Sequence, residues 1–469
     1  MVLQWYYNSI LMSREGASML GRINELKLLE DLYSKKEMQV VFLQGEKDIG
    51  KTILLNEFLK NKVRAYFCIR NSTNNIYKAS FSAELAVQGF SDLRDVTWRQ
   101  TLDNIIKKSI GEKVILAIDN ADLIKSSFNE LLDALTENMR RLKDKIRLYL
   151  VFVGEDLVYV KKVLAEFNQH STVIILKRLR YQEVIPYLDN LENEEKLILY
   201  GVLGGYPEYF KLIDCTRSLK DNLLKLFFSV DSVFLNLGET VLSTKVREPY
   251  YYHAILCSVS CGSLRMKDIA EAVGESDSKV SKYINVLVRM GILKKITPLQ
   301  DGESKSSRNA FYLMNNKTLE FWYAYVFPFL SNIKLGRGNQ VLRENVLPRL
   351  TGYAYKTFLE ICYQHCFVLK ERNNFYVDFD SLDYDFDKNG TLDSMRLVAK
   401  TSKEICFVKC YWKNNRMDYD EILEFVNMFS EENRRCFYVI FSRKGFTERA
   451  LATEANKDNI RLISLRYLK

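Results

Sequence analysis

The sequence lacks any apolar run of the roughly 18 residues that a membrane-spanning helix needs; "FWYAYVFPFL" (321–330) is among its longest. It has only six prolines in 469 residues, with 47% hydrophobic and 27% charged residues, which excludes a proline-rich, low-complexity chain and fits a globular protein. Residues 1–18 lack both a basic leading region and a sustained apolar segment, so we expect no secretory signal there. We expect this segment to be either a poorly ordered arm or translated sequence upstream of a natural start at Met19.

Histidine is also scarce, with three in the chain, and this counts against a zinc site. Three pairs of cysteines have the spacing Cys-x-x-x-Cys, which we interpret as buried thiols that pack as small apolar groups. The nine cysteines are an odd number scattered through a long chain, so we expect reduced thiols and a cytoplasmic protein. The pairs are Cys257/Cys261, Cys362/Cys366 and Cys406/Cys410.

Neither sign of charge dominates, since 68 Lys and Arg face 59 Asp and Glu, for a net charge of +9. This mild basic excess permits contact with nucleic acid, but the charges are interspersed along the chain and do not predict it alone. We expect no membrane partner. The length predicts about three domains.

The stretch "LQGEKDIGKT" has the spacing Gly-x-x-x-x-Gly-Lys-Thr of a phosphate-binding loop (P-loop). The glycines let the backbone wrap an anion, the lysine supplies a positive charge, and the threonine offers a hydroxyl to Mg²⁺. "MQVVFLQ" before it predicts a buried strand and "KTILLNEFLKNK" after it predicts a helix, which places the phosphates at a helix N-terminus. The predicted residues for ATP or ADP are Gly45, Glu46, Lys47, Asp48, Ile49, Gly50, Lys51 and Thr52.

A second strand should end in an acid that shares Mg²⁺ with Thr52. "KVILAIDNADLI" (113–124) supplies it, because an apolar run leads directly into Asp119. The next residue, where a glutamate would act as general base, is Asn120, whose amide positions water but accepts no proton. Asp122 is an alternative acid if a turn redirects it. We therefore expect tight nucleotide binding and slow hydrolysis, and we expect Asn120→Glu to raise turnover.

Two further apolar runs predict strands. "RLYLVFVGEDL" (147–157) is expected beside the strand of Asp119, and its end near Gly154 and Glu155 is where a polar residue can sense the γ-phosphate. "TVIILKRLR" (172–180) ends in a basic cluster that is either solvated charge or the source of an arginine for a phosphate. The cluster contains Lys177, Arg178 and Arg180.

Four segments together resemble the archaeal and bacterial AAA-type ATPases of the STAND-like group: "MLGRINELKLLEDLY" (19–33), the P-loop, "VILAIDNAD" and "GGYPEYF" (204–210). The resemblance implies a P-loop ATPase core followed by a small helical lid. The family typically has Asp-Glu where this chain has Asp119 and Asn120. The resemblance also implies a base-contacting box at Gly21, Arg22 and Glu25, and a lid segment at Gly204, Gly205 and Pro207.

From Pro249 the pattern changes to short helices at 250–262, 265–274 and 276–290, followed by two strands around a polar loop. This order predicts a winged helix-turn-helix, with a buried aromatic helix at 319–330 after it. One interpretation places helix 276–290 in the DNA major groove; the other makes the module a structural or protein-docking element. The candidate DNA contacts are Lys279, Lys282, Lys305 and Arg308.

The last part is predicted as an α/β domain that resembles the PD-(D/E)xK nuclease-like domain of the same ATPase family. The resemblance implies a metal site with Asp393 in the first position, but Lys409 and Tyr411 stand where Glu and Lys are needed. A single acid cannot hold a catalytic Mg²⁺ pair, so we expect a degenerate site without nuclease activity, for which Glu360 or Asp380 are the remaining acids. The predicted elements are helix 346–365, strands 375–380, 392–400 and 404–412, helix 419–430, strand 435–442, a helix and a final strand.

The expected fold class is thus α/β: an AAA-type P-loop core, a helical lid, a winged helix and a restriction-endonuclease-like domain. Three functions are compatible with it. The first is an ATP-dependent switch that acts on a protein partner or on duplex DNA. The second is a DNA-binding regulator with a structural nucleotide, and the third is an ATP-dependent nuclease. The expected boundaries are arm 1–18, core 19–180, lid 181–248, winged helix and aromatic helix 249–345, and nuclease-like domain 346–469.

Overall fold

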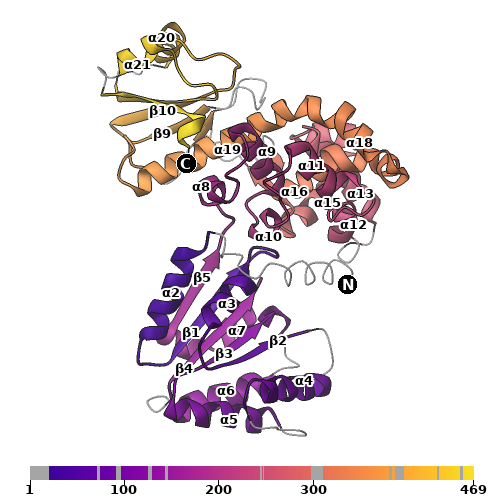
Figure 1. The fold of residues 1–469 in the computed structure, drawn as a ribbon, viewed down its shortest axis with the longest axis vertical. Helices are drawn as coiled ribbons and strands as arrows, with labels where there is room; N and C mark the ends of the chain where they lie inside the picture. Colours follow the sequence, from indigo (N-terminus) through magenta and orange to yellow (C-terminus); the bar gives the residue numbers. More distant parts are fainter. Residues whose placement is uncertain are drawn as a thin grey trace. The chain divides into compact units, whose positions relative to one another are not determined.

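The computed structural model of the chain describes residues 21–70, 74–90, 97–124, 129–142, 146–242, 246, 248–296, 310–379, 383–385, 396–429, 433–454 and 458–468 (Figure 1). The described residues form two compact units. The N-terminal unit runs to Leu179 and also includes Tyr206–Glu208. The C-terminal unit comprises Arg180–Gly205 and the chain from Tyr209 onward.

A five-stranded parallel sheet forms the centre of the N-terminal unit, in the order β2-β3-β4-β1-β5. Its strands are rich in apolar residues, and β3 and β4 are buried along their whole length, as expected where helices cover both faces. The predicted strands are confirmed, β4 lies beside β3 as expected, and β2 is an addition that the sequence did not indicate. The strands are β1 (Gln39–Gly45), β2 (Arg64–Cys68), β3 (Val114–Asp119), β4 (Leu148–Gly154) and β5 (Ser171–Leu176).

Helices cover both faces of this sheet (Figure 1). On one face the rings of Tyr33, Phe58 and Tyr149 meet with centroids 5.5 to 5.9 Å apart. Alternate residues of β1, β3 and β4 point to the other face and share one core with four helices. Because the strands are parallel, their carboxyl ends meet at one edge. The first face carries α2 (Ile23–Ser34) and α3 (Lys51–Leu59), and the second α4 (Asn74–Val87), α5 (Trp98–Gly111), α6 (Asn129–Leu142) and α7 (Val158–Val163).

The C-terminal unit begins with short helices and continues into three helices and an antiparallel strand pair, in the order expected for 249–314. The first of these three helices buries Tyr252, Ile255 and Leu256. The elements are α8 (Tyr181–Val184), α9 (Asn193–Leu203), α10 (Pro207–Phe210, whose first two residues belong to the N-terminal unit), α11 (Leu219–Leu223), α12 (Leu237–Leu242), α13 (Pro249–Ser260), α14 (Met266–Val273), α15 (Asp277–Arg289), β6 (Leu293–Ile296) and β7 (Phe311–Met314).

A helical stretch from residue 317 to residue 371 follows. It widens into π-type turns at 322–326, 333–337 and 342–346, and the first and third of these end two residues before a proline, Pro328 and Pro348. A proline has no N–H to donate and its ring clashes with the carbonyl four residues earlier, which accounts for the widening at 322–326 and 342–346. The predicted aromatic helix is therefore interrupted, although Phe321 and Trp322 are buried as expected. The helices are α16 (Lys317–Phe321), α17 (Leu330–Asn332), α18 (Gly338–Val341) and α19 (Leu350–Glu371).

The chain ends in a second five-stranded sheet, in the order β12-β11-β10-β9-β8, with β10 to β12 parallel and β8 and β9 antiparallel. The strand predicted at 375–380 is wrong: residues 375–379 form no strand, although Val377 and Phe379 are buried. The elements are β8 (Asp383–Asp385), β9 (Arg396–Lys400), β10 (Glu404–Tyr411), α20 (Tyr419–Met428), β11 (Arg435–Ser442), α21 (Glu448–Glu454) and β12 (Ile460–Ser464).

Candidate functional site

The loop between β1 and α3 lies at the carboxyl edge of the N-terminal sheet. At Gly45 a β-carbon would meet Ile49 Cγ2 at 2.9 Å and the Leu176 carbonyl oxygen at 3.0 Å, so the position has room only for glycine. Gly50 has φ +89°, a conformation that glycine adopts without strain. The loop therefore turns sharply into the first residue of α3, Lys51, and leads onto a helix N-terminus as the motif predicts.

Thr52 and Asp119 lie in contact at this edge. The Thr52 hydroxyl donates to Asp119 Oδ2 at 2.8 Å, and the Tyr66 hydroxyl donates to the same oxygen at 3.2 Å. Asp119 is 2% exposed at the end of β3. Burial and the charge of Asp119 raise the pKa of Tyr66, so its phenol remains a donor. The structure thus brings a buried carboxylate and a threonine hydroxyl together, and hard oxygen ligands of this kind suit Mg²⁺.

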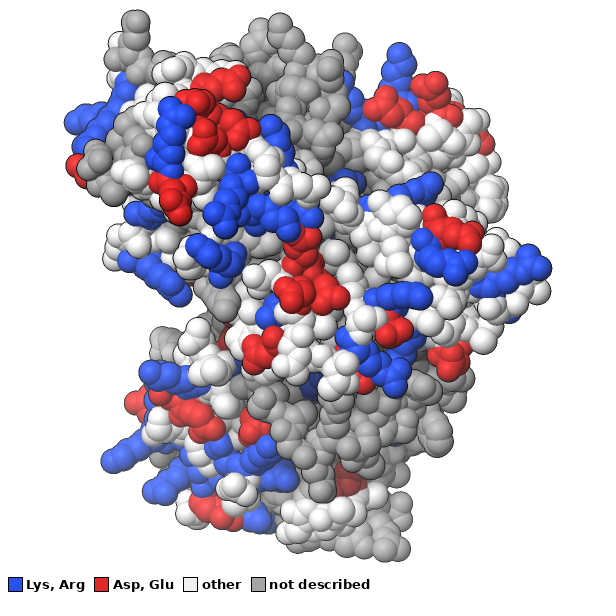
Figure 2. All heavy atoms as spheres, turned by 45° about the horizontal axis from the view of Figure 1, so that its top comes forward, with Lys and Arg blue, Asp and Glu red and all other residues white. Residues whose placement is uncertain are grey.

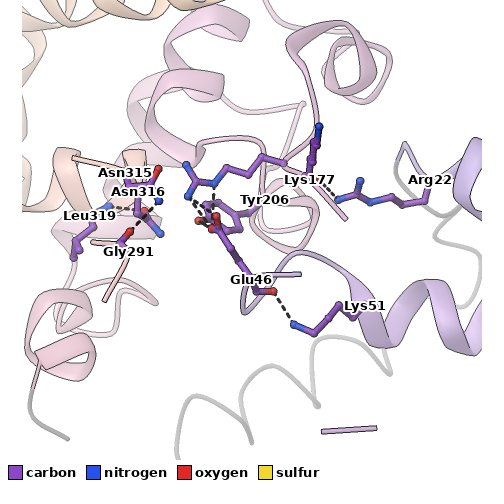
Figure 3. A network of polar contacts seen from close by, with 10 residues as sticks. Arg22, Glu46, Lys51, Lys177, Tyr206, Gly291, Asn315, Asn316 and Leu319 are labelled. Carbon is purple, nitrogen blue, oxygen red and sulfur yellow. Dashed lines mark hydrogen bonds and ion pairs between the residues drawn. The ribbon is translucent and has the colours of Figure 1, made fainter. Parts of the chain in front are cut away.

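The Lys51 side chain points back toward the backbone of the P-loop at Glu46 (Figure 3). Its Nζ donates to the carbonyl oxygens of Gly45 at 2.8 Å and of Glu46 at 2.7 Å. Burial lowers the pKa of Lys51, and the negative charges of Glu155 and Asp119 oppose that shift. The ammonium group is therefore held between the backbone of the loop and nearby acids.

Arg22 is buried beside the same loop, with 3% of its surface exposed. Its guanidinium donates to the carbonyl of Lys177 at 2.6 Å (Figure 3), to the carbonyl of Ile49 at 3.1 Å and to Glu25 at 3.0 Å. Gly21, which precedes it, has φ +66°. Among the described residues the buried Nε of Arg22 has no hydrogen-bond partner. A buried donor without a partner is rare and costly, so this N–H is available to a ligand or a water molecule.

Glu46, the second residue of the loop, is held by two residues outside the motif. Arg178 Nη2 donates to Glu46 Oε2 at 2.8 Å and the Tyr206 hydroxyl donates at 2.6 Å, while the guanidinium lies 5.0 Å from the centre of the Tyr206 ring. Burial opposes the charge of Glu46, but these two partners hold its pKa below the usual value. Arg178 of the basic cluster therefore reaches the loop, whereas Arg180 pairs with Glu371.

Asn120 directly follows β3, and its side chain is turned toward the end of β2. This residue has φ +54°, and its side-chain amide donates to the Ile69 carbonyl at 3.1 Å and to Cys68 Sγ at 3.3 Å. The amide therefore ties the end of β3 to the end of β2 and makes no described donation toward the loop. Asp122 is redirected to β4, where its Oδ1 accepts the backbone N–H of Glu155 at 3.2 Å.

The candidate DNA contacts differ in their surroundings. Lys279 donates to Glu275 at 2.7 Å and also to the hydroxyl of Tyr251, so its charge is already engaged. Lys282 is exposed on α15. Lys305 and Arg308 lie outside the described residues.

Sequence reasoning missed two residues of α15. Asn285 and Arg289 are exposed and, with Lys282, follow the spacing of one helical face. The signal was available, since both residues lie within the helix 276–290 that the sequence predicted. On the face shown in Figure 2, basic and acidic side chains of the described residues lie interspersed.

Lys409 and Tyr411 lie on the face of β10 that α20 covers. Lys409 Nζ lies 5.0 Å from the centre of the Phe425 ring, and the Tyr411 hydroxyl donates to Glu421 at 2.7 Å. Both residues therefore take part in packing between β10 and α20.

Glu360 belongs to α19, which packs on the opposite face of β10. Cys362 of this helix contacts Cys410, and successive side chains of a strand point to opposite faces, so Cys410 points away from the face of Lys409 and Tyr411. Glu360 pairs with Lys317 at 3.6 Å. Glu360 therefore lies away from Lys409 and Tyr411. Asp393 and Asp380 lie outside the described residues.

Two cysteine pairs face each other where α19 packs on β10. Cys362, Cys366 and Cys406 are fully buried, and burial raises the pKa of all three, so they are neutral thiols. In the part of the chain that the structure describes, no group of three or more His, Cys, Asp or Glu is arranged to hold a metal ion. No helix among the described residues is both long and apolar enough to cross a membrane.

The fold and the loop define an α/β protein with a P-loop motif at the carboxyl edge of a parallel sheet. The family described as "Archaea bacterial proteins of unknown function" (DUF234) matches residues 322–422. An uncharacterised protein of Methanocaldococcus jannaschii is 21% identical over 401 residues, which cover 84% of this chain and 88% of that protein.

Solved structures are similar at lower identity. The Walker-type ATPase of Pyrococcus abyssi is 15% identical with a TM-score of 0.46, over 65% of this chain and 96% of that one. Cdc6p of Pyrobaculum aerophilum is 14% identical with a TM-score of 0.36, over 68% of this chain and 96% of that one.

Proposed function

We propose that this protein binds ATP with Mg²⁺ at the P-loop, hydrolyses it slowly and works as a nucleotide-dependent switch. The observation that carries the proposal is the hydrogen bond of 2.8 Å between Thr52 and Asp119, which are 67 residues apart. The two motifs that a P-loop ATPase needs for Mg²⁺ thus meet at one edge of the sheet.

The residues around the loop fit a nucleotide triphosphate. The first N–H groups of α3 have no side-chain cap among the described residues, so they are free to bind an anion. Lys51 can exchange two carbonyl partners for phosphate oxygens, which gives stronger, charge-assisted hydrogen bonds. Arg22 offers its buried Nε–H beside the loop, in agreement with the base-contacting role that the family resemblance implies.

Thr52 and Asp119 would hold Mg²⁺, which would neutralise charge on the bound phosphates. Slow hydrolysis follows from Asn120, because the residue directly after Asp119 accepts no proton and its amide is engaged with β2. Bound ATP is therefore expected to stay unhydrolysed for long periods, so that the ATP-bound form can act as one state of a switch.

The switch is proposed from the path of the chain. Tyr206, which bonds to Glu46 of the loop, directly follows Gly204 and Gly205, with φ +65° and +74°. α9 precedes these glycines, and its Glu194 is bonded to the end of β11. A phosphate that displaces Glu46 from its partners would thus act on Tyr206 and, through two conformationally adaptable glycines, on α9. The C-terminal elements would then engage a protein partner or DNA.

The test compares Lys51→Ala with Lys60→Ala, an exposed lysine at the far end of the same helix, α3. Loss of a charged hydrogen bond is expected to raise the Kd for fluorescent ATP by about ten-fold or more in Lys51→Ala. Lys60→Ala should bind ATP as the wild type does. Equal binding by the wild type and Lys51→Ala would refute the site.

A second candidate is a DNA-binding regulator in which nucleotide only stabilises the fold. The exposed Lys282, Asn285 and Arg289 of α15 favour it, as do the exposed Lys294 and Lys295 of β6. Phosphate contacts would dominate, so binding to labelled duplex DNA should be weak and should disappear as salt is raised. A Lys282→Ala/Arg289→Ala variant that binds as the wild type does would remove this candidate.

A further inference from the structure

A glutamate beyond those assigned above lies at the same edge of the sheet. β4 is the strand between β1 and β3, with Gln44 opposite Gly154 and Ile118 opposite Phe152. Glu155 is the first residue after β4. It therefore lies between the loop that follows β1 and the acid that ends β3.

The backbone of Glu155 is fixed from both sides. Its N–H donates to Asp122 Oδ1 at 3.2 Å, and its carbonyl accepts from Gln44 Nε2 at 3.0 Å. A β-carbon at Gly154 would lie 2.5 Å from the same Asp122 oxygen, so the glycine is required for this close approach. These contacts attach Glu155 both to the strand that leads into the P-loop and to the turn after Asp119.

The other carboxylates near the loop are already engaged. Asp119 accepts two hydroxyl donors, Asp122 accepts the N–H of Glu155, and Glu46 accepts Arg178 and Tyr206. Asp48 belongs to the loop itself and has a partner of its own. Glu155 is exposed, and among the described residues only its backbone forms hydrogen bonds. Its negative charge also acts on Lys51 more strongly than that of Asp119 or Asp122.

We propose that Glu155 is the general base that activates water for ATP hydrolysis, an inference that rests on the proposed nucleotide site. The carboxylate takes one proton from water as the water oxygen bonds to the γ-phosphorus. The bond from that phosphorus to the β–γ bridging oxygen breaks, and its electron pair leaves with ADP. Glu155 then returns the proton to the released phosphate. Because no described side chain holds the carboxylate in place, its positioning is loose and the reaction is slow.

The experiment measures binding and chemistry separately in the full-length protein with Mg²⁺. Loss of a general base should slow single-turnover phosphate release in Glu155→Gln by about 10²-fold or more, while the Kd for fluorescent ATP stays within about three-fold. Glu155→Asp should give an intermediate rate. The matched control is Asp156→Asn, which makes the same charge change one residue on. Asp156 Oδ1 accepts the Val158 N–H at 3.0 Å, a bond that asparagine also makes, so this control should keep the wild-type rate.

The outcomes separate this inference from the proposed function. A Glu155→Gln rate equal to that of the wild type overturns the inference, and so does a wild type that binds ATP without releasing phosphate. In both cases the nucleotide site stands if Lys51→Ala still loses ATP. Equal loss of affinity and rate in Glu155→Gln would assign this residue to binding and also overturn it. A wild-type protein that binds no ATP would refute both the proposed nucleotide site and the role of Glu155.

Discussion

At the scale of single residues, the backbone conformation of Asn120 argues against the faster ATP turnover that the sequence predicted for Asn120→Glu. Its φ of +54° is readily adopted by asparagine and disfavoured for glutamate, and a carboxylate cannot donate to the Ile69 carbonyl. We therefore predict that Asn120→Glu destabilises the N-terminal unit by about 1–3 kcal/mol and does not raise ATP turnover. Melting temperatures and phosphate-release rates of the variant and wild type check this.

The control for this prediction is Asn120→Gly. Glycine accepts the same φ without strain and loses only the side-chain hydrogen bonds, so its melting temperature should lie between those of the wild type and Asn120→Glu. A glutamate variant that is as stable as the wild type and turns over faster would restore the expectation drawn from the sequence.

The spacing of the P-loop motif indicated from sequence which residues form the tight loop, because that loop has a particular backbone geometry. Gly45, Gly50 and Asp119 could be assigned from sequence, because a tight loop and a strand end fix which residues are possible there. The bond of Tyr206 to Glu46 could not, since it joins positions 160 residues apart through the fold. Glu155 could be placed at a strand end, but no sequence pattern shows that its carboxylate has no hydrogen-bond partner among the described residues.

At the scale of elements, one carboxylate joins α9 to the end of β11. Glu194 accepts Arg443 Nη2 at 2.7 Å and Lys444 Nζ at 2.8 Å, and Arg443 lies over the ring of Trp412. These hydrogen bonds, Arg443 first, lower the pKa of Glu194 from 4.5 to about 2, although burial opposes them. A lowered pKa in the folded state means that the stabilisation is complete above pH 4.5 and is lost as the pH falls toward 2.

We accordingly predict that Glu194→Gln lowers the melting temperature at pH 7. The difference from the wild type should shrink as the pH is lowered through this window, because the wild-type carboxylate becomes protonated. Glu271→Gln, an exposed acid on α14, is the control and should melt like the wild type at each pH. A difference between Glu194→Gln and wild type that does not change with pH would mean that the ion pairs contribute nothing to the attachment of α9.

The elements that could be predicted were those with a long apolar run. β3 and β4 are such runs, whereas β2 has five residues and begins with the exposed Arg64, so its pattern is weak. The segment "FYVDFD" shows the converse error, because Val377 and Phe379 are buried without pairing as a strand. Periodicity reports burial, and burial alone does not decide between a strand and an ordered loop.

At the scale of the whole molecule, the sequence predicted which kinds of element follow one another, but not how the strands are arranged. The order β2-β3-β4-β1-β5 depends on crossovers between strands that are far apart in the chain, and only the structure shows it. The second sheet has the same limit. Its strand β10 was predicted from the sequence. The sequence did not show that α19 covers one face of β10 and α20 the other, and this arrangement decides which side chains could meet at a metal site.

Because α19 and α20 cover opposite faces of β10, an assay for DNA cleavage tests whether the C-terminal domain has a functional metal site. Metal-dependent cleavage of a phosphodiester needs at least two carboxylates on one side of the sheet, because Mg²⁺ prefers several hard oxygen ligands. Lys409 and Tyr411 occupy the α20 side of β10 instead, where they contact Phe425 and Glu421. Glu360 lies on the α19 side, away from these two residues, and pairs with Lys317.

We therefore predict no cleavage of single-stranded or duplex DNA by the full-length protein in Mg²⁺ or Mn²⁺, with or without ATP. Plasmid and oligonucleotide substrates resolved on gels measure this, and Asp393→Ala should be indistinguishable from the wild type. Cleavage by the wild type that is lost in Asp393→Ala would contradict the prediction. It would require a second acid beside Asp393 on the same side of the sheet, which neither Lys409 nor a neutral phenol at Tyr411 can replace.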